Sequence, residues 1–185
     1  MNVKKRGVSK ARNIGARKAK GELLIFLDAD TVLGPKFTTK MQESFANSNV
    51  VYVSSALVGL ERSGIVDSLF KFFHYGLVNK IAALTAHLGF PLFPTVCCAC
   101  RKRIFHKIGG FDESLAIAED LVFSLKIGKV GKCLVNKEAK AYTSLRRIKK
   151  HGRMKNYFIY FRNYLRVFML NQKPWIHDFP HTIEA

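Results

Sequence analysis

A run of five consecutive apolar residues, 23–27 (LLIFL), ends directly in an acidic turn and constrains the fold more than any other segment. A continuous run of this length between turn residues is typical of a β-strand buried on both faces. Residues 8–20 before it have the pattern of a helix, with Ser9 as its expected N-cap and Gly21 just beyond its end. A helix, a buried strand and an acidic turn in this order predict an α/β sheet.

The rest of the chain continues this alternation of helices and strands. In the first helix, a narrow face of Ala11, Ile14, Gly15 and Ala19 is expected to pack closely on the sheet. Further helices are expected at residues 35–46, 65–88, 101–108, 119–129 and 154–170, and strands at 50–58, 95–100, 133–135 and 141–145.

The charge balance indicates an anionic partner. The 185 residues include 31 Lys and Arg against 13 Asp and Glu, a formal net charge of +18. Such a charge attracts a nucleotide diphosphate, an anionic lipid headgroup or nucleic acid, and the charge alone does not choose among them. The apolar share of 48% is enough for the core of one ordinary domain.

Four cysteines, of which Cys97, Cys98 and Cys100 lie together in an apolar stretch, are expected to be reduced and buried. Reduced thiols suit a cytoplasmic compartment. The basic N-terminus is not followed by the apolar segment of a secretory signal, and no run of about 18 apolar residues predicts a spanning helix. We therefore expect a cytoplasmic protein, and a place at the inner face of the membrane stays open.

Asp28 and Asp30 form the sharpest candidate site. Carboxylates at the end of a buried strand face the crevice where open α/β sheets bind ligands. Carboxylate oxygens suit Mg²⁺ or Mn²⁺, and such ions keep coordination places for substrate phosphates. A solvated acidic turn is the alternative interpretation of the same residues.

Glu119 and Asp120 form a second acidic pair, at the expected start of a helix. The helix dipole favours acids at that position, which explains the pair without a function. The functional alternative makes one of them a general base, because a hydroxyl nucleophile is weak until a positioned base takes its proton.

The order of these motifs resembles glycosyltransferase family 2. The resemblance rests on residues 7–15 (GVSKARNIG), 19–22 (AKGE), 27–30 (LDAD), 109–113 (GGFDE) and 119–120 (ED), and it covers about residues 7–125. It implies a GT-A fold, that is, a Rossmann-like mixed sheet flanked by helices, and the inverting transfer of a sugar from a nucleotide-diphosphate donor to a hydroxyl of a glycan or lipid-linked acceptor.

The resemblance also implies roles for single residues. Asp30 would coordinate the Mn²⁺ or Mg²⁺ that bridges the donor diphosphate, and Asp28 would contact the ribose or assist the metal. Asp120 would be the catalytic base, and Glu119 would shape the acceptor side. Arg12 would lie near the nucleotide, although a surface arginine on a basic helix explains it equally.

One departure from the family concerns the N-terminal region. The family begins with a strand, turn and helix that bind the nucleotide base, whereas only six residues precede Gly7 here. We therefore expect residues 1–145 to form a partial, N-terminally truncated GT-A domain, either as a fragment or completed by a separate chain. Residues 146–185 are expected to form a basic connection, an amphipathic helix and a tail.

The C-terminal region leaves several interpretations open. The basic residues 146–153 could meet a diphosphate or an anionic lipid, or could be a solvated connection, and His151 is a weaker metal candidate. The helix at 154–170 could lie on a membrane surface or pack its aromatic stripe on the domain, and residues 65–88 raise the same question.

Two other functions compete with the transferase. One is an inactive remnant that binds a membrane or a partner chain. The other is a nucleic-acid-binding module, which predicts aromatic residues among the basic ones. The first twenty residues contain no aromatic residue, so no nucleic-acid partner is expected.

Overall fold

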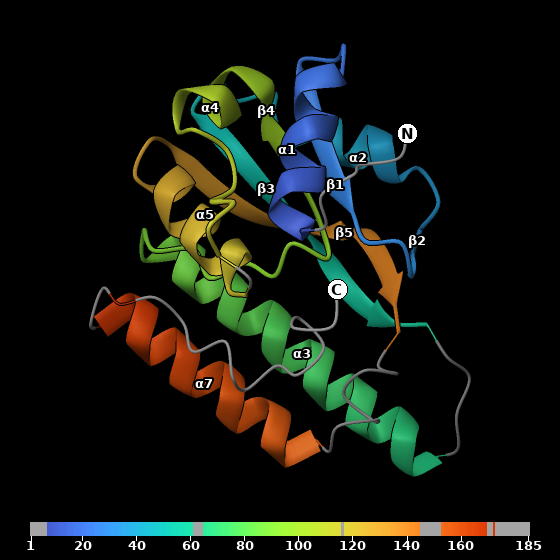
Figure 1. The fold of residues 1–185 in the computed structure, drawn as a ribbon. Coiled ribbons are helices and arrows are strands. Elements are labelled where there is room, and N and C mark those ends of the chain that lie inside the picture. Colours follow the sequence, from blue (N-terminus) through green and yellow to red (C-terminus); the bar gives the residue numbers. More distant parts are fainter. Residues whose placement is uncertain (1–6, 61–64, 116, 145–152, 170–171, 173–185) are drawn as a thin grey trace.

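A five-stranded mixed sheet runs through the molecule (Figure 1). The computed structural model describes residues 7–60, 65–115, 117–144, 153–169 and 172. The strand order is β1-β4-β3-β5-β2, and the bounds are β1 Leu23–Leu27, β2 Thr31–Leu33, β3 Val50–Gly59, β4 Cys97–Arg101 and β5 Lys132–Thr143.

Strand directions make the sheet mixed. β3 and β5 are parallel, whereas the pairs β1–β4, β3–β4 and β2–β5 are antiparallel. The two short strands expected at 133–135 and 141–145 are the two ends of the single strand β5. The register shifts between them, because Ser55 pairs with Asn136 and Ala56 with Lys140. The Asn136 side chain holds this bulge by accepting hydrogen bonds from the backbone N–H groups of Glu138 and Ala139.

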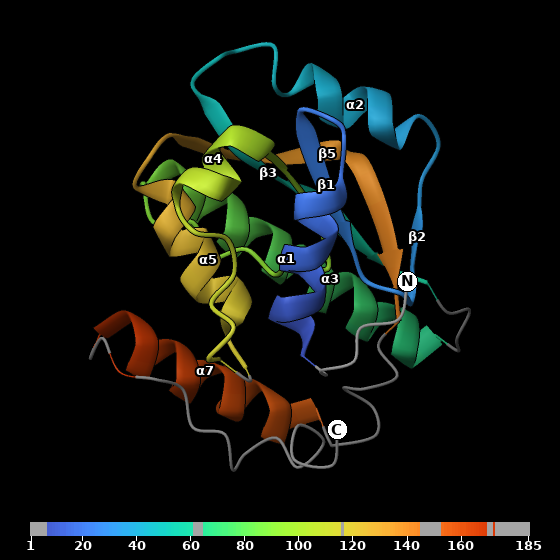
Figure 2. The same cartoon turned by 45° about the horizontal axis from the view of Figure 1, so that its top comes forward.

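Helices cover both faces of the sheet (Figures 1 and 2). One buried cluster joins α1, α4 and α5 to Phe26 of β1 and Tyr52 of β3, and a second joins α2 to Val53 and Ala99. The long helix α3 contributes Ala82 to the first cluster and Tyr75 to the second. The helices are α1 Val8–Lys18, α2 Phe37–Glu43, α3 Ile65–His87, α4 Lys102–Lys107, α5 Glu119–Gly128 and α7 Arg153–Met169.

The predicted burial of β1 on both faces is wrong. β1 is an edge strand, paired only with β4 among the described residues, and its side chains alternate between inside and outside. Leu24 and Phe26 are buried, whereas Ile25 and Leu27 are 40% and 45% exposed. An apolar run therefore does not reveal by itself which face of a strand the fold covers.

The expected packing face of α1 is confirmed only in part, since Ala19 packs against the first buried cluster. The helix begins at Val8 with Gly7 as its N-cap, so Ser9 lies inside the helix, and Ala11 and Gly15 are exposed. The buried side is polar as well as small, and consists of Ser9, Asn13 and Ala16. Hydrophobic periodicity could not find this face because two of its three buried residues are polar.

An aromatic cluster under α1, α4 and α5 accounts for part of the high phenylalanine content. Phe111 stacks on Phe123 with ring centroids 4.2 Å apart and meets Phe26 edge-on at 5.2 Å. Phe105 and Tyr52 complete the contacts around Phe123. Offset and edge-on ring pairs of this kind stabilise a core beyond the area that they bury.

All four cysteines are buried free thiols, as predicted. Burial raises the pKa of Cys98 and of Cys133 to about 12. Cys97 and Cys100 have the spacing of a C-x-x-C motif, but β4 directs them to opposite faces of the sheet, into different clusters. They therefore do not form one metal or redox site.

Two helices complete the described structure. In both views α7 runs beside α3 and in the same direction, on the side of the molecule away from α2 and α4 (Figures 1 and 2). α3 is continuous from Ile65 to His87. No helix in the described ranges combines the length and apolarity needed to cross a bilayer.

Candidate active site

The acidic turn after β1 is fixed by its backbone. The N–H of Asp28 donates to the carbonyl oxygen of Val96 at 2.9 Å, and the N–H of Thr31 donates to the carbonyl oxygen of Asp28 at 3.1 Å. β2 begins directly after this turn. The side chain of Asp28 is 40% exposed and Asp30 is exposed, so carboxylate oxygens at this corner remain accessible to a ligand.

Arg12 joins the two acidic motifs. Its Nη2 lies 2.9 Å from Asp28 Oδ1, and its Nη1 lies 3.0 Å from Glu119 Oε1. These contacts connect residues that are 16 and 107 positions apart in sequence. The turn after β1 and the start of α5 are therefore neighbours in the fold.

The environment of Arg12 shows that it is not a surface arginine. Its side chain is only 13% exposed, its Nη2 also approaches the carbonyl oxygen of Thr95 at 3.4 Å, and its guanidinium lies 5.2 Å from the centre of the Phe111 ring. Burial alone would lower the pKa of Arg12, but the charges of Asp28 and Glu119 outweigh that effect and raise it. Arg12 is thus a permanent internal cation of the site.

The carboxyl of Asp120 has a raised pKa. Burial, and to a smaller extent the negative charge of Glu119, raise the pKa of the Asp120 carboxyl to about 7. The backbone N–H of Leu121, 2.8 Å from Asp120 Oδ1, and the charge of Arg12 act in the opposite direction. A carboxyl that titrates near neutral pH can accept a proton from a hydroxyl and release it again.

The start of α5 is reached through a strained residue. Ala118, the N-cap of α5, has φ 55°, in the left-handed region that residues other than glycine rarely adopt. The following two residues, Glu119 and Asp120, are the first of the helix. Strain of this kind is often concentrated at functional sites.

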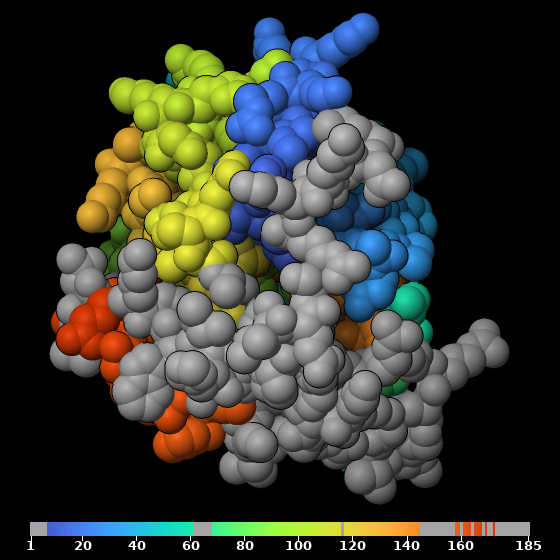
Figure 3. Space-filling view, in the orientation of Figure 1, coloured from blue at the N-terminus to red at the C-terminus, as the bar shows by residue number. Residues whose placement is uncertain are grey.

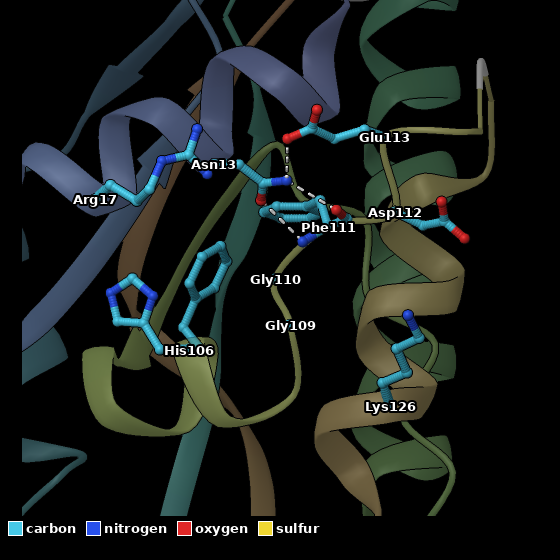
Figure 4. Close-up of a pocket in the computed structure, with 10 residues that line it drawn as sticks. Asn13, Arg17, His106, Gly109, Gly110, Phe111, Asp112, Glu113 and Lys126 are labelled. Atoms are coloured by element: carbon cyan, nitrogen blue, oxygen red, sulfur yellow. Dashed lines mark hydrogen bonds between the residues drawn. The ribbon is translucent and has the colours of Figure 1, made fainter.

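Asn13 fastens α1 to the loop around Phe111 (Figure 4). Its side-chain amide donates to the carbonyl oxygen of Phe111 at 2.8 Å and to Glu113 Oε1 at 2.9 Å, while its Oδ1 accepts from the Phe111 N–H at 2.9 Å. Asn13 directly follows Arg12 in the chain. The contact therefore sets the position from which Arg12 reaches both acids.

The geometry of the same loop explains why two of its residues are glycines. Gly109 and Gly110 have φ of +82° and +68°, which ends α4. A Cβ on Gly110 would lie 2.7 Å from Asn13 Oδ1 and 2.9 Å from the Phe105 ring, whereas a Cβ on Gly109 would meet nothing within 4 Å. Gly110 is needed for the close approach of α1 as well as for its backbone angle.

A cavity of about 460 Å³ lies beside this contact (Figure 4). Its lining includes Asn13, Phe111 and Glu113, which form that contact, together with Arg17, His106 and Lys126. On the surface, the segment around Phe111 lies directly against α1 (Figure 3). None of the predicted site residues Arg12, Asp28, Asp30, Glu119 and Asp120 lines this cavity.

The carboxylate oxygens at the acidic turn are of the type that Mg²⁺ or Mn²⁺ binds, but they do not form a complete coordination shell. In the described part of the chain, no three Asp, Glu, His or Cys side chains gather as a metal cluster. Asp28 and the exposed Asp30 offer one or two carboxylates, which is the number that such ions usually take from a protein when phosphates complete the shell. His151, the weaker metal candidate, lies outside the described residues.

Sequence reasoning missed Asn13 and the aromatic support of Arg12. Asn13 lies within the matched motif at 7–15, but nothing in its type or spacing distinguishes it from a solvated residue on a basic helix. One signal was present in the sequence. Asn13 lies four residues after Ser9 and three before Ala16, so it shares one helical face with these two small residues.

Comparison with known proteins identifies the family. The model of the family described as glycosyl transferase family 2 matches residues 1–109. An uncharacterized glycosyltransferase of Haemophilus influenzae is 31% identical over 136 residues, which are 68% of this chain and 42% of the relative. A pre-mycofactocin glycosyltransferase of Mycobacterium tuberculosis is 23% identical over 128 residues, which are 68% of this chain and 27% of the relative.

Solved structures show the same fold. The mannosyltransferase PcManGT from Pyrobaculum calidifontis, in complex with GDP-Man and Mn²⁺, superposes with a TM-score of 0.63 at 17% identity, over 97% of this chain and 48% of its own. TarS of S. aureus, in complex with UDP-GlcNAc, gives a TM-score of 0.51 at 22% identity, over 76% of this chain and 39% of its own.

These comparisons confirm the GT-A fold, and they show that the chain spans less than half the length of the relatives named above. The matched family segment contains Arg12, Asn13, Asp28 and Asp30. Because the family model covers more than half of the chain, the chain belongs to glycosyl transferase family 2.

Proposed function

We propose that this chain carries the catalytic centre of an inverting glycosyltransferase that moves a sugar from a nucleotide-diphosphate donor to a hydroxyl of a glycan or lipid-linked acceptor. The observation that carries the proposal is the position of Arg12, which contacts Asp28 at one acidic corner and Glu119 at the other. Two acidic motifs separated by about half of the chain thus meet at one buried cation. A solvated acidic turn and a helix-dipole pair would not need this connection.

In the proposed reaction, Asp120 is the base. The acceptor hydroxyl approaches the sugar from the face opposite the diphosphate, and its oxygen forms a bond to the anomeric carbon as the carbon–oxygen bond to the diphosphate breaks. Asp120 accepts the hydroxyl proton during this step. Its pKa of about 7 supports the role, because catalysis by a base is most effective when its pKa lies near the working pH.

Arg12 and Glu119 are positioning residues in this proposal. Arg12 holds the Glu119 carboxylate at 3.0 Å, and so holds the first turn of α5 that carries Asp120. Its second contact, to Asp28, ties that turn to the end of β1. Glu119 also keeps the pKa of its neighbour Asp120 high through its charge.

Asp30 and Asp28 are the proposed ligands of Mn²⁺ or Mg²⁺. A bound ion of this kind neutralises negative charge that collects on a leaving diphosphate. Asp28 is already engaged with Arg12, whereas Asp30 is exposed, so Asp30 is the principal candidate. The presence of Mn²⁺ beside GDP-Man in the PcManGT structure supports this assignment.

Calorimetric titration tests the donor site without relying on turnover. We expect the chain to bind GDP or UDP in the presence of Mn²⁺ and to lose affinity when Mn²⁺ is removed by a chelator. Asp30→Asn should weaken Mn²⁺-dependent binding by about tenfold or more, because it removes a charged oxygen ligand. Glu43→Gln, at an exposed acid of α2, is the matched control and should leave binding unchanged. Equal affinities of the Asp30→Asn and parent chains would refute the metal assignment.

A further inference from the structure

The outward side of α3 is apolar although nothing in the described structure covers it. Tyr75 and Ala82 on the inner side are buried against the sheet. The opposite side exposes a stripe of residues spaced three and four apart, with Phe72 75% and Phe73 68% exposed. A helix that is apolar all round is normally surrounded by other apolar groups. The exposed stripe consists of Leu69, Phe72, Phe73, Leu77, Ile81 and Leu84.

The neighbouring helix α7 repeats this arrangement. Among the side chains of α7 that the structure describes, Ile159 and Asn163 are buried, whereas Phe158, Phe161, Leu165 and Met169 are exposed and again follow helical spacing. α7 lies beside α3 in both views (Figures 1 and 2). We call the stripes of the two helices together the α3–α7 apolar face. Its four phenylalanines are more than 60% exposed, which is far beyond the scattered apolar residues of an ordinary surface.

The charges of the two helices are mostly basic, and the one acidic residue is Asp67, near the start of α3. Helix α7 contains Arg153, Lys155, Arg162 and Arg166 and no acidic residue, and of these Arg162 has two buried guanidinium nitrogens. In the sequence, no Asp or Glu occurs anywhere from residue 146 to residue 169, and five of residues 146–153 are Lys or Arg. On α3, Lys80 is exposed within the apolar stripe. An apolar stripe with basic residues beside it is the pattern of helices that lie in the interface of an anionic membrane.

We propose that the α3–α7 apolar face docks this chain on an anionic lipid bilayer, with both helices lying in the plane of one leaflet. The exposed phenylalanines and leucines would enter the acyl boundary, and the basic residues would meet the lipid phosphates. The docking is peripheral, since no described helix is suited to cross a bilayer. This inference does not depend on the transferase chemistry, because it uses none of its residues.

Charge decides between this occupant and a second copy of the chain. A dimer through the α3–α7 apolar face would bring two chains of net charge +18 together at α7, which carries four basic residues and no acidic one, and like charges oppose that contact. An anionic bilayer offers both an apolar interior and the opposite charge. Apolar burial and electrostatic attraction therefore both favour binding to the lipid surface, whereas only apolar burial favours the dimer.

Vesicle flotation tests the proposal with the full chain. We expect it to float with vesicles of phosphatidylcholine and phosphatidylglycerol, to bind phosphatidylcholine vesicles much more weakly, and to detach as NaCl is raised. Phe72→Ser combined with Phe73→Ser should lower partitioning to the mixed vesicles by about tenfold or more, because each lost ring removes a large buried apolar group. Circular-dichroism melting of each variant establishes that it is folded.

A matched pair of single substitutions separates docking from general surface polarity. Ile81 on the α3–α7 apolar face is 44% exposed, and Ile25 on β1 is 40% exposed. Ile81→Ser should weaken flotation, and Ile25→Ser should not. Equal flotation of the folded phenylalanine variant and the parent chain would overturn the proposal. So would a parent chain that ignores both vesicle types and sediments as a dimer, with the phenylalanine variant sedimenting as a monomer.

Discussion

At the scale of single residues, the site is organised around charges that the fold partly removes from water. Two carboxylates within 3.0 Å of the Arg12 guanidinium offset the cost of burying its charge. Asp120 lies close to the same cation, yet burial and the adjacent Glu119 dominate its titration and raise its pKa to about 7. Two neighbouring acids at the start of one helix thus differ, because Glu119 forms an ion pair with Arg12 whereas Asp120, the proposed base, has a raised pKa.

Asp120→Asn should have opposite effects on activity and on stability. Transfer should fall by about a hundredfold or more, which is the usual contribution of a general base. The pKa of Asp120 is raised from 3.8 to about 7 by folding. Between these values the folded chain keeps a proton that the unfolded chain has lost, so the acid lowers stability increasingly as pH rises toward 7.

Asparagine removes this penalty, so the variant should be more stable than the parent by roughly 2–4 kcal/mol at about pH 8, and the difference should vanish near pH 4. Urea unfolding at the two pH values measures both quantities. A variant that is no more stable than the parent at pH 8 would show that Asp120 ionises without cost, and would contradict its raised pKa.

Sequence reasoning at this scale identified the acids and Arg12 but not their connections. Asp28, Asp30, Glu119 and Asp120 were recognisable because acidic residues after an apolar run and before a helix are conspicuous. Asn13 was not, because its importance lies in bonds to the backbone of Phe111, 98 positions away. The packing partner of a polar residue is a property of the tertiary fold and leaves no periodic signal.

At the scale of elements, the contact between Asn13 of α1 and Phe111 in the loop after α4 determines where Arg12 can reach. We call this contact the joint. The joint depends on two hydrogen bonds between Asn13 and the Phe111 backbone and on the absence of a Cβ at Gly110. α1 has few apolar side chains to hold it by packing alone, since its only buried apolar residue is Ala16. The attachment of α1 to the rest of the fold therefore depends to an unusual degree on these polar contacts.

Gly110→Ala should be more damaging than Gly109→Ala. Both residues have positive φ, so either alanine should cost about 1–2 kcal/mol of unfolding free energy through its backbone. At Gly110 the new Cβ also meets Asn13 Oδ1 and the Phe105 ring, which should add about 1–3 kcal/mol of overpacking.

Urea unfolding of the two variants isolates the contribution of the joint, because Gly109→Ala carries the same kind of backbone strain without the contact. Gly110→Ala should also weaken transfer by displacing Arg12. Equal losses of stability in the two variants would mean that α1 does not depend on close approach at Gly110.

Elements were predictable from the sequence where their pattern is local. The helices at 119–129 and 154–170 and the strand at 50–58 lie within one or two residues of α5, α7 and β3. The burial of β1 and the continuity of β5 were not predictable, because they depend on which strands lie beside them. The exposure of α3 on its outer side likewise reflects what covers the helix and not its composition.

At the scale of the whole molecule, the net charge of +18 acts on folding and on binding in opposite directions. Excess positive charge repels itself in the compact state, so it lowers the free energy of unfolding. The same excess draws the chain to an anionic surface. Salt screens both the self-repulsion and the attraction to the surface. The two effects can be told apart because screening the first raises stability and screening the second weakens binding.

Adding NaCl should therefore stabilise the isolated chain while it weakens vesicle binding. Between about 0.01 M and 0.15 M NaCl the screening length falls from about 30 Å to about 8 Å, which removes most repulsion between distant surface charges. We expect the free energy of unfolding to rise by about 1 kcal/mol over this range, measured by urea unfolding without lipid. The contacts of Arg12 with Asp28 and Glu119 should contribute little to the response, because partly buried pairs are screened less than exposed charges. A free energy of unfolding that falls with salt would mean that specific ion pairs, and not general repulsion, dominate the electrostatics of this chain.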